Sequence, residues 1–118
     1  MPSKRAKAAK PVPTPQAFFD GAVPRVLTIM RATCAELGGK HCIVVEGAGE
    51  WTLDFPNARV VAGRHQPDVT VYLAPEQFAS LSTSKVELAK LVADGKARYE
   101  GDRSRVENVS LILAFLER

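Results

Sequence analysis

The sequence predicts a single domain of the α+β class, because of its length and of two kinds of periodicity. The chain has 118 residues, of which 46% are hydrophobic and 25% charged, so it is long enough to bury a core of its own. Five short runs alternate apolar and polar residues or are rich in β-branched residues, as strands are. Longer segments around them repeat apolar residues every three to four positions, as helices do.

The first helix is expected from Ala22 to Leu37, after a short helical or turn segment at residues 15–20. Pro24 stands near its start, where a helix tolerates proline, and Gly38 and Gly39 are expected to end it. Its apolar residues share one broad face: Val23, Val26, Leu27, Ile29, Met30, Cys34 and Leu37.

The expected strands cover residues 41–46, 50–55, 59–62, 69–73 and 96–100. The second is the clearest, since Trp51, Leu53 and Phe55 alternate with Thr52 and Asp54. The segment Gly47-Ala48-Gly49 is typical of a hairpin turn and predicts that the first two strands pair.

Two helices are expected between the fourth and fifth strands. The first opens at Ala74-Pro75-Glu76 and has Phe78 and Leu81 on its apolar face. Ser84, with Glu87 at capping-box spacing, is expected to begin the second, and Gly95 to end it. The apolar positions of that second helix are Val86, Leu88, Leu91 and Val92.

Gly95 is followed by Lys96, a pair that also occurs in phosphate-binding loops of the Walker type. Such a loop needs glycine five residues before the pair and Ser or Thr after it, but Lys90 and Ala97 hold these positions. The sequence therefore excludes a Walker loop. We expect Gly101-Asp102 to turn the chain into the last helix, with Asp102 as its N-cap.

The last helix, expected over residues 103–116, carries more apolar surface than one buried face requires. One stripe consists of Val106, Val109, Ile112, Leu113 and Leu116. Leu111 and Phe115 form a second stripe beside it. Deep burial, a dimer interface and the wall of an apolar cavity each explain this excess.

Charge is concentrated in the first fifteen residues, which hold four Lys or Arg and no acid, with three prolines in the last five of them. The remainder has 16 − 4 = 12 basic against 13 acidic residues, a net charge of −1. We expect residues 1–15 to be a disordered basic tail and residues 16–118 to form the domain. The tail is either a weak tether to anionic membrane or nucleic acid, or a solubilising extension. No secretory signal, membrane span or peroxisomal tripeptide is predicted, and a cytoplasmic location is expected by default.

Residue types that perform chemistry are few and scattered. Cys34 and Cys42 are too few for a disulfide framework, and neither His41 nor His65 joins them at a zinc-like spacing. We expect both thiols to be buried as small hydrophobes. Four carboxylates are expected to be solvated: Glu46, Glu50, Asp54 and Asp68. The sequence therefore predicts no catalytic residue, no metal site and no cofactor, and indicates a protein that binds rather than an enzyme.

The order of elements and three motifs resemble the sterol carrier protein type 2 domain. The motifs are the tryptophan-containing strand GEWTLDF, the strand and helix PDVTVYLAPEQFASL, and the segment Gly95 to Asp102 with the form G-K-x-x-x-x-G-D. The resemblance covers roughly Phe18 to Leu116. It implies a five-stranded, mostly antiparallel sheet with helices packed on one face, which together enclose an apolar tunnel.

The resemblance also implies that the chain binds sterols, fatty acids, fatty acyl-CoA, phospholipids or isoprenoid quinone precursors. We therefore expect a non-enzymatic protein of bacterial type that transfers or presents an apolar lipid, with transient membrane contact. Arg25 or Arg31 is a candidate partner for the lipid head group. The side chains expected to line the tunnel are Leu53, Phe55, Val71, Leu73, Phe78, Leu81, Leu88, Leu91, Ile112, Leu113 and Leu116.

Two alternatives stay open beside lipid transfer. In the first, the broad apolar face of the last helix docks on a protein partner or on a second copy, which makes a homodimer. In the second, the domain feeds a lipid substrate to a separate enzyme. A nucleic-acid partner is not expected, since only the tail is basic.

Overall fold

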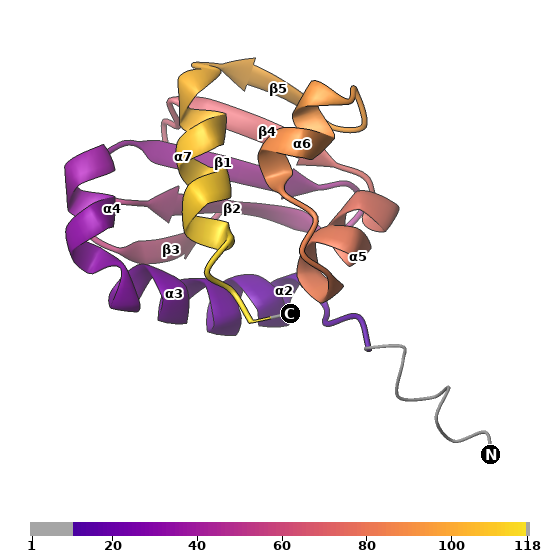
Figure 1. Cartoon of the computed structure of the whole chain (residues 1–118), viewed down its shortest axis with the longest axis horizontal. Coiled ribbons are helices and arrows are strands. Elements are labelled where there is room, and N and C mark those ends of the chain that lie inside the picture. Colours follow the sequence, from indigo (N-terminus) through magenta and orange to yellow (C-terminus); the bar gives the residue numbers. More distant parts are fainter. Residues whose placement is uncertain (1–10, 118) are drawn as a thin grey trace.

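A computed structural model of the chain describes residues 11–117, and the expected tail falls mostly outside this range. One sheet carries all the helices on a single face (Figure 1). The helical elements are α2 (Pro15–Ala17), the π-helical turn η1 (Phe18–Ala22), α3 (Val23–Ile29), α4 (Arg31–Leu37), α5 (Pro75–Thr83), α6 (Leu88–Ala93) and α7 (Ser104–Leu113). The strands are β1 (Lys40–Val45), β2 (Gly49–Asp54), β3 (Arg59–Ala62), β4 (Val69–Leu73) and β5 (Arg98–Gly101).

The sheet has the strand order β3-β2-β1-β4-β5. Three of its strand pairs are antiparallel and one, β1 with β4, is parallel. The hairpin between β1 and β2 confirms the predicted turn, in which the N–H of Ala48 donates to the carbonyl of Val45 at 2.9 Å. The expected five-stranded, mostly antiparallel sheet with helices on one face is confirmed.

The helix-covered face of the sheet, called here the inner face, is apolar because side chains alternate along each strand. The register places Ile43 of β1 between Trp51 of β2 and Val71 of β4, and all three are buried. The N-terminal helical segment packs on them through Phe19, whose ring stacks on Trp51 with centroids 4.7 Å apart. These contacts bind the helical layer to the sheet.

The N-terminal helical segment begins at Pro15, where the hydroxyl of Thr14 accepts the N–H of Ala17 at 3.1 Å. It widens into the π-helical turn η1, in which the N–H of Val23 reaches the carbonyl of Phe18. This wide turn precedes Pro24, which has no N–H to continue an α-helical ladder and whose ring needs room against the preceding turn.

The single helix predicted over residues 22–37 is wrong in one respect, because the chain breaks at Met30. The dihedral angles of Met30 are −98° and 25°, outside the helical range, and they separate α3 from α4. Ile29, predicted on the apolar face, stands directly before this break and is 75% exposed, whereas Cys34 after the break is buried. Two short helices, α3 and α4, therefore stand in place of the single helix predicted.

The predicted cap of the helix after α5 is also wrong. Ser84 ends α5 instead, with its N–H and its hydroxyl both donating to the carbonyl of Ser80, at 3.1 and 2.7 Å. Its hydroxyl is directed back to α5, so α6 begins only at Leu88. Gly95 ends α6 as predicted, with a φ of +75° that favours glycine.

The last helix, α7, ends at Leu113 and not at residue 116 as predicted, and the two predicted apolar stripes differ in burial. The first stripe is buried throughout: Val106, Val109, Ile112, Leu113 and Leu116. The second is exposed, with Leu111 at 49% and Phe115 at 57%. Asp102 accepts the N–H of Ser104 at 3.0 Å as a capping residue does, and hydrogen bonds from the hydroxyl and N–H of Ser104 lower the pKa of its carboxyl.

The opposite, outer face of the sheet holds polar side chains that are buried and paired. Asp54 was expected to be solvated, but it is only 4% exposed. It accepts the side-chain amide of Asn57 at 2.8 Å, and the Arg59 guanidinium lies 3.5 Å away. Burial alone raises the pKa of Asp54, but these hydrogen bonds together outweigh it and the pKa lies below its ordinary value. The carboxylate therefore fixes the turn between β2 and β3.

Candidate functional site

The side chains predicted to line a tunnel lie together between the sheet and the helices. They belong to one buried apolar cluster, contributed by β2, β4, α5, α6 and the α7 segment: Leu53, Phe55, Val71, Leu73, Phe78, Leu81, Leu88, Leu91, Ile112, Leu113 and Leu116. Within the described residues these side chains pack against one another, and the tunnel itself is not shown. The structure does show two surface hollows that reach members of this cluster.

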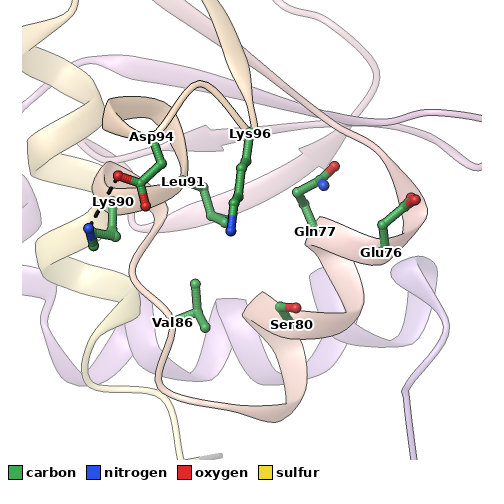
Figure 2. Close-up of a pocket in the computed structure, with 8 residues that line it drawn as sticks. All are labelled: Glu76, Gln77, Ser80, Val86, Lys90, Leu91, Asp94 and Lys96. Atoms are coloured by element: carbon green, nitrogen blue, oxygen red, sulfur yellow. Dashed lines mark hydrogen bonds and ion pairs between the residues drawn. The ribbon is translucent and has the colours of Figure 1, made fainter.

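The first hollow lies between α5 and α6 and has a volume of about 450 Å³. Figure 2 shows Val86 and Leu91 on one side, Gln77 and Ser80 on the other, and the Lys90–Asp94 ion pair at the rim. The ammonium of Lys90 lies 3.2 Å from the Asp94 carboxylate. Leu91 is a buried member of the apolar cluster, so this hollow leads to the predicted lining.

The second hollow lies between α3 and the chain after α7, with a volume of about 340 Å³. Ile29 and Phe115 are its exposed apolar side chains, and the buried Val26 and Leu116 lie at its base. Arg25, predicted as a head-group partner, also lines this hollow, whereas Arg31 does not. Glu117 lines it as well, so the hollow presents one side chain of each charge beside exposed apolar surface.

One polar side chain on the inner face escaped the sequence analysis. His41 of β1 is fully buried, with its ring centroid 4.1 Å from that of Phe55. Burial lowers the pKa of His41 to about 4, so its imidazole is neutral at neutral pH. The sequence contained a signal for it, since His41 lies in the same alternating phase as the buried Ile43 and Val45.

Both thiols are buried as expected, and neither takes part in a disulfide. Burial raises the pKa of Cys34 and of Cys42, which keeps both in the less reactive thiol form. Within residues 11–117, no three His, Cys, Asp or Glu side chains gather closely enough to hold a metal ion. No helix in that range is both long and apolar enough to cross a bilayer.

Comparison with solved structures places the fold among sterol carrier proteins. Sterol Carrier Protein-2 from Aedes aegypti, in complex with the C16 fatty acid palmitate, matches with a TM-score of 0.66 and 13% identity, over 84% of this chain and 94% of that one. Sterol Carrier Protein 2 from Yarrowia lipolytica, in its apo form, matches with a TM-score of 0.57 and 17% identity, over 80% and 78%. The ubiquinone synthesis protein UbiJ-SCP2 matches with a TM-score of 0.60 and 17% identity, over 88% and 94%.

Comparison of the sequence with known proteins indicates the same family as comparison of the structures. A search of curated proteins gave no match. The sequence signature of the SCP-2 sterol transfer family, however, matches residues 26–114, which include every strand, all helices from α4 to α7 and most of α3. Since this is most of the chain, the protein belongs to the SCP-2 sterol transfer family.

Proposed function

We propose that this chain binds an apolar lipid between its sheet and its helices, and transfers or presents that lipid without changing it chemically. A sterol, a fatty acid, a fatty acyl-CoA or an isoprenoid fits this description. The observation that carries the proposal is the continuous apolar layer under α5, α6 and α7, which two surface hollows approach at the core residues Leu91 and Leu116.

The energetics favour such a guest without any dedicated polar contact. Each methylene removed from water contributes roughly 0.8 kcal/mol. An alkyl chain of about twelve carbons therefore gains ~10 kcal/mol before the costs of ordering it and of parting the layers are subtracted. A site of this kind accepts many alkyl chains, and its selectivity depends on the few polar groups at its ends.

The hollow between α5 and α6 is the side through which we expect the lipid to reach the core. Residues 84–87 link the two helices without helical structure, and the dihedral angles of Ser84 and Glu87 are extended. A linker outside regular structure opens at a lower free-energy cost than a helix does. Lys96 lines the same hollow and offers a positive charge to a carboxylate or phosphate at its mouth.

Family membership and the palmitate complex of the Aedes aegypti relative support this proposal. SCP-2 domains are, as a rule, lipid-binding modules without catalysis, which agrees with the scattered chemistry of this sequence. We infer transient contact with a membrane from the need to collect a lipid of this kind. The expected cytoplasmic location stays a prediction.

Displacement of a fluorescent fatty acid, together with native mass spectrometry after gentle purification, tests the proposal. The wild-type chain is expected to bind the probe and to release it when unlabelled palmitate is added. Val86→Trp, which fills the α5–α6 hollow, is expected to lower the affinity about tenfold, which corresponds to ~1.4 kcal/mol. Leu111→Trp, at an exposed position of α7 that lines neither hollow, is the matched control and should bind as wild type does. If wild type binds no ligand in either assay, the proposal is wrong.

The exposed apolar side chains Ile29, Leu111 and Phe115 favour a second function, docking on a protein partner or on a second copy. The ubiquinone synthesis protein among the structural neighbours supports a related role, in which the domain presents a lipid to an enzyme. Sedimentation should then show a dimer or complex that Phe115→Glu dissociates without unfolding the chain. A monomer at all concentrations, with no bound partner, contradicts this second function.

A further inference from the structure

The fully buried His41 stands at the start of β1, on the inner face, under the first turn of α7. Its Nδ1 lies 3.2 Å from the carbonyl oxygen of Leu53. A carbonyl only accepts hydrogen bonds, so the single proton of the neutral ring must be on Nδ1. The other ring nitrogen, Nε2, is therefore a lone-pair acceptor.

This Nε2 has no hydrogen-bond partner among the described residues. Buried polar atoms in folded proteins are almost always paired, and an unpaired acceptor costs free energy that a partner would recover. Every other buried side-chain acceptor or donor in residues 11–117 is paired. The exception lies on the face of the sheet where the lipid is proposed to bind.

A second polar group approaches the same place from α7. Nη1 of Arg105 donates to the carbonyl oxygens of Leu37 and Gly38, at 3.4 and 3.2 Å, and its Nε lies 3.6 Å from Asp102 and 3.9 Å from Asp68. These contacts hold the guanidinium in place.

Gly39 lies against both nitrogens. A Cβ on Gly39 would collide with Nη1 of Arg105 and would stand 3.1 Å from Nε2 of His41. The absence of a side chain at this position thus lets an acceptor atom and a guanidinium approach the same backbone position, beside the apolar layer. Asp68 and Asp54 are the remaining charged groups around the imidazole.

A hydroxyl group matches this pair of nitrogens in both directions. Its proton can be donated to Nε2 of His41, and its oxygen can accept an N–H from Nη2 of Arg105, because Nη1 and Nε already make the contacts given above. A carboxylate has no proton for Nε2, and a hydrocarbon end satisfies neither group. Resting on the proposed function, we propose that His41 and Arg105 form the polar end of the lipid site and select apolar ligands that end in a hydroxyl group.

The position of His41 at the start of β1 predicts how such a ligand would be oriented relative to the sheet. β1 begins beside α4, with His41 as its second residue, and ends on the side of the sheet where α5 lies (Figure 1). The predicted lining side chains occupy the space between these ends. A ligand with its hydroxyl at His41 would lie along β1 with its tail toward the α5–α6 hollow.

The test compares dodecanol with dodecyl methyl ether, which retains the oxygen acceptor but lacks the proton, by displacement of Nile red from wild type and from His41→Phe. The affinity for dodecanol divided by the affinity for the ether is expected to be about five- to tenfold higher in wild type than in His41→Phe. This factor corresponds to the loss of one buried hydrogen bond. His65→Phe is the matched control for an exposed histidine and should keep the wild-type ratio. Affinity for the ether should be equal in all three chains within about twofold.

If both ligands displace the dye and the ratio is the same in wild type and His41→Phe, the inference is wrong and the proposed function stands. If neither ligand displaces it, the proposed function fails as well. The ¹⁵N chemical shift of His41 Nε2 in wild type gives an answer even if His41→Phe does not fold. Dodecanol should move this resonance and the ether should not. An identical shift with both ligands would indicate a resident water only and would overturn the inference.

Discussion

The two faces of the sheet bury polar groups in different ways. On the outer face, Thr52 donates its hydroxyl to the carbonyl of Gly63 at 2.7 Å and accepts the N–H of His65 at 3.1 Å, and Asp54 is paired with Asn57. On the inner face the contacts are apolar, apart from His41, which leaves one nitrogen without a partner. Among residues 11–117, the buried polar side chains of the outer face therefore find their partners within the chain, whereas the inner face keeps one buried nitrogen without a partner.

This difference predicts that the outer face of the sheet serves stability, whereas the inner face serves both stability and ligand binding. Pairing of the outer polar groups fixes the β2–β3 turn and the loop after β3, so substitutions there should affect stability alone. Substitutions on the inner face should affect stability through packing and, where they touch His41, ligand preference as well. The predictions below test this division, from the largest expected effect to the smallest.

Leu53→Ala should cause the largest loss of stability, because it removes a fully buried side chain from the centre of the inner face. Deletions of this kind lower the free energy of unfolding by about 2–5 kcal/mol. Urea unfolding, followed by the fluorescence of the lone Trp51, measures the loss. Phe115→Ala, which truncates an exposed side chain just after α7, is the control and should change the free energy of unfolding little. A loss below ~1 kcal/mol for Leu53→Ala would indicate that the layers are already apart at this point.

Acid should produce the next largest effect, through His41. Its folded-state pKa of about 4 lies below the ordinary value of 6.5, so the unfolded chain takes up the proton first as the pH falls. The contribution of neutral His41 to the free energy of unfolding is complete above pH 6.5 and is lost as the pH falls through 4. Its total is about 3 kcal/mol.

Urea unfolding between pH 7 and 4 measures this dependence. In His41→Phe, which cannot take up a proton, the decline over this range should be shallower by roughly the same amount. Parallel curves for the two chains would contradict the assignment of the lost stability to His41. Carboxylates with lowered pKa values, such as Asp54 and Asp102, should contribute mainly at lower pH.

Much of this architecture could be predicted from periodicity, because periodicity reports which side chains one face buries. The alternation of Trp51, Leu53 and Phe55 and the buried stripe of α7 were both found in this way. The break at Met30 and the role of Ser84 were not, because they depend on how short helices fit a curved sheet. The same limit explains Asp54 and His41: the pattern assigns each a face, but only the fold shows whether a partner such as Asn57 is within reach.

Thr52→Val, next to Leu53 but on the outer face, should have a smaller effect than Leu53→Ala. It keeps the shape of the side chain and removes the hydroxyl that pairs two backbone groups of the loop after β3. The expected loss is about 1–3 kcal/mol, with lipid binding unchanged. Urea unfolding and Nile red titration measure the two quantities on the same sample. A change in lipid affinity would show that the two faces are coupled.

The smallest effect is expected at Arg98, also on the outer face. Its guanidinium lies 3.8 Å from the centroid of the Tyr72 ring, and the Tyr72 hydroxyl donates to Glu100 at 2.8 Å, so the three side chains join β4 to the edge strand β5. At an exposed site a cation–π contact is worth about 0.5–1 kcal/mol, and Arg98→Gln should lower the free energy of unfolding by that amount. A double-mutant cycle with Tyr72→Leu isolates the contact from the general effect of each substitution. Lys85→Gln, on the exposed linker between α5 and α6, controls for the loss of one positive charge. A coupling energy near zero would mean that the backbone pairing of β4 and β5 suffices to hold this edge, and that the outer face contributes to stability only where its polar groups are buried.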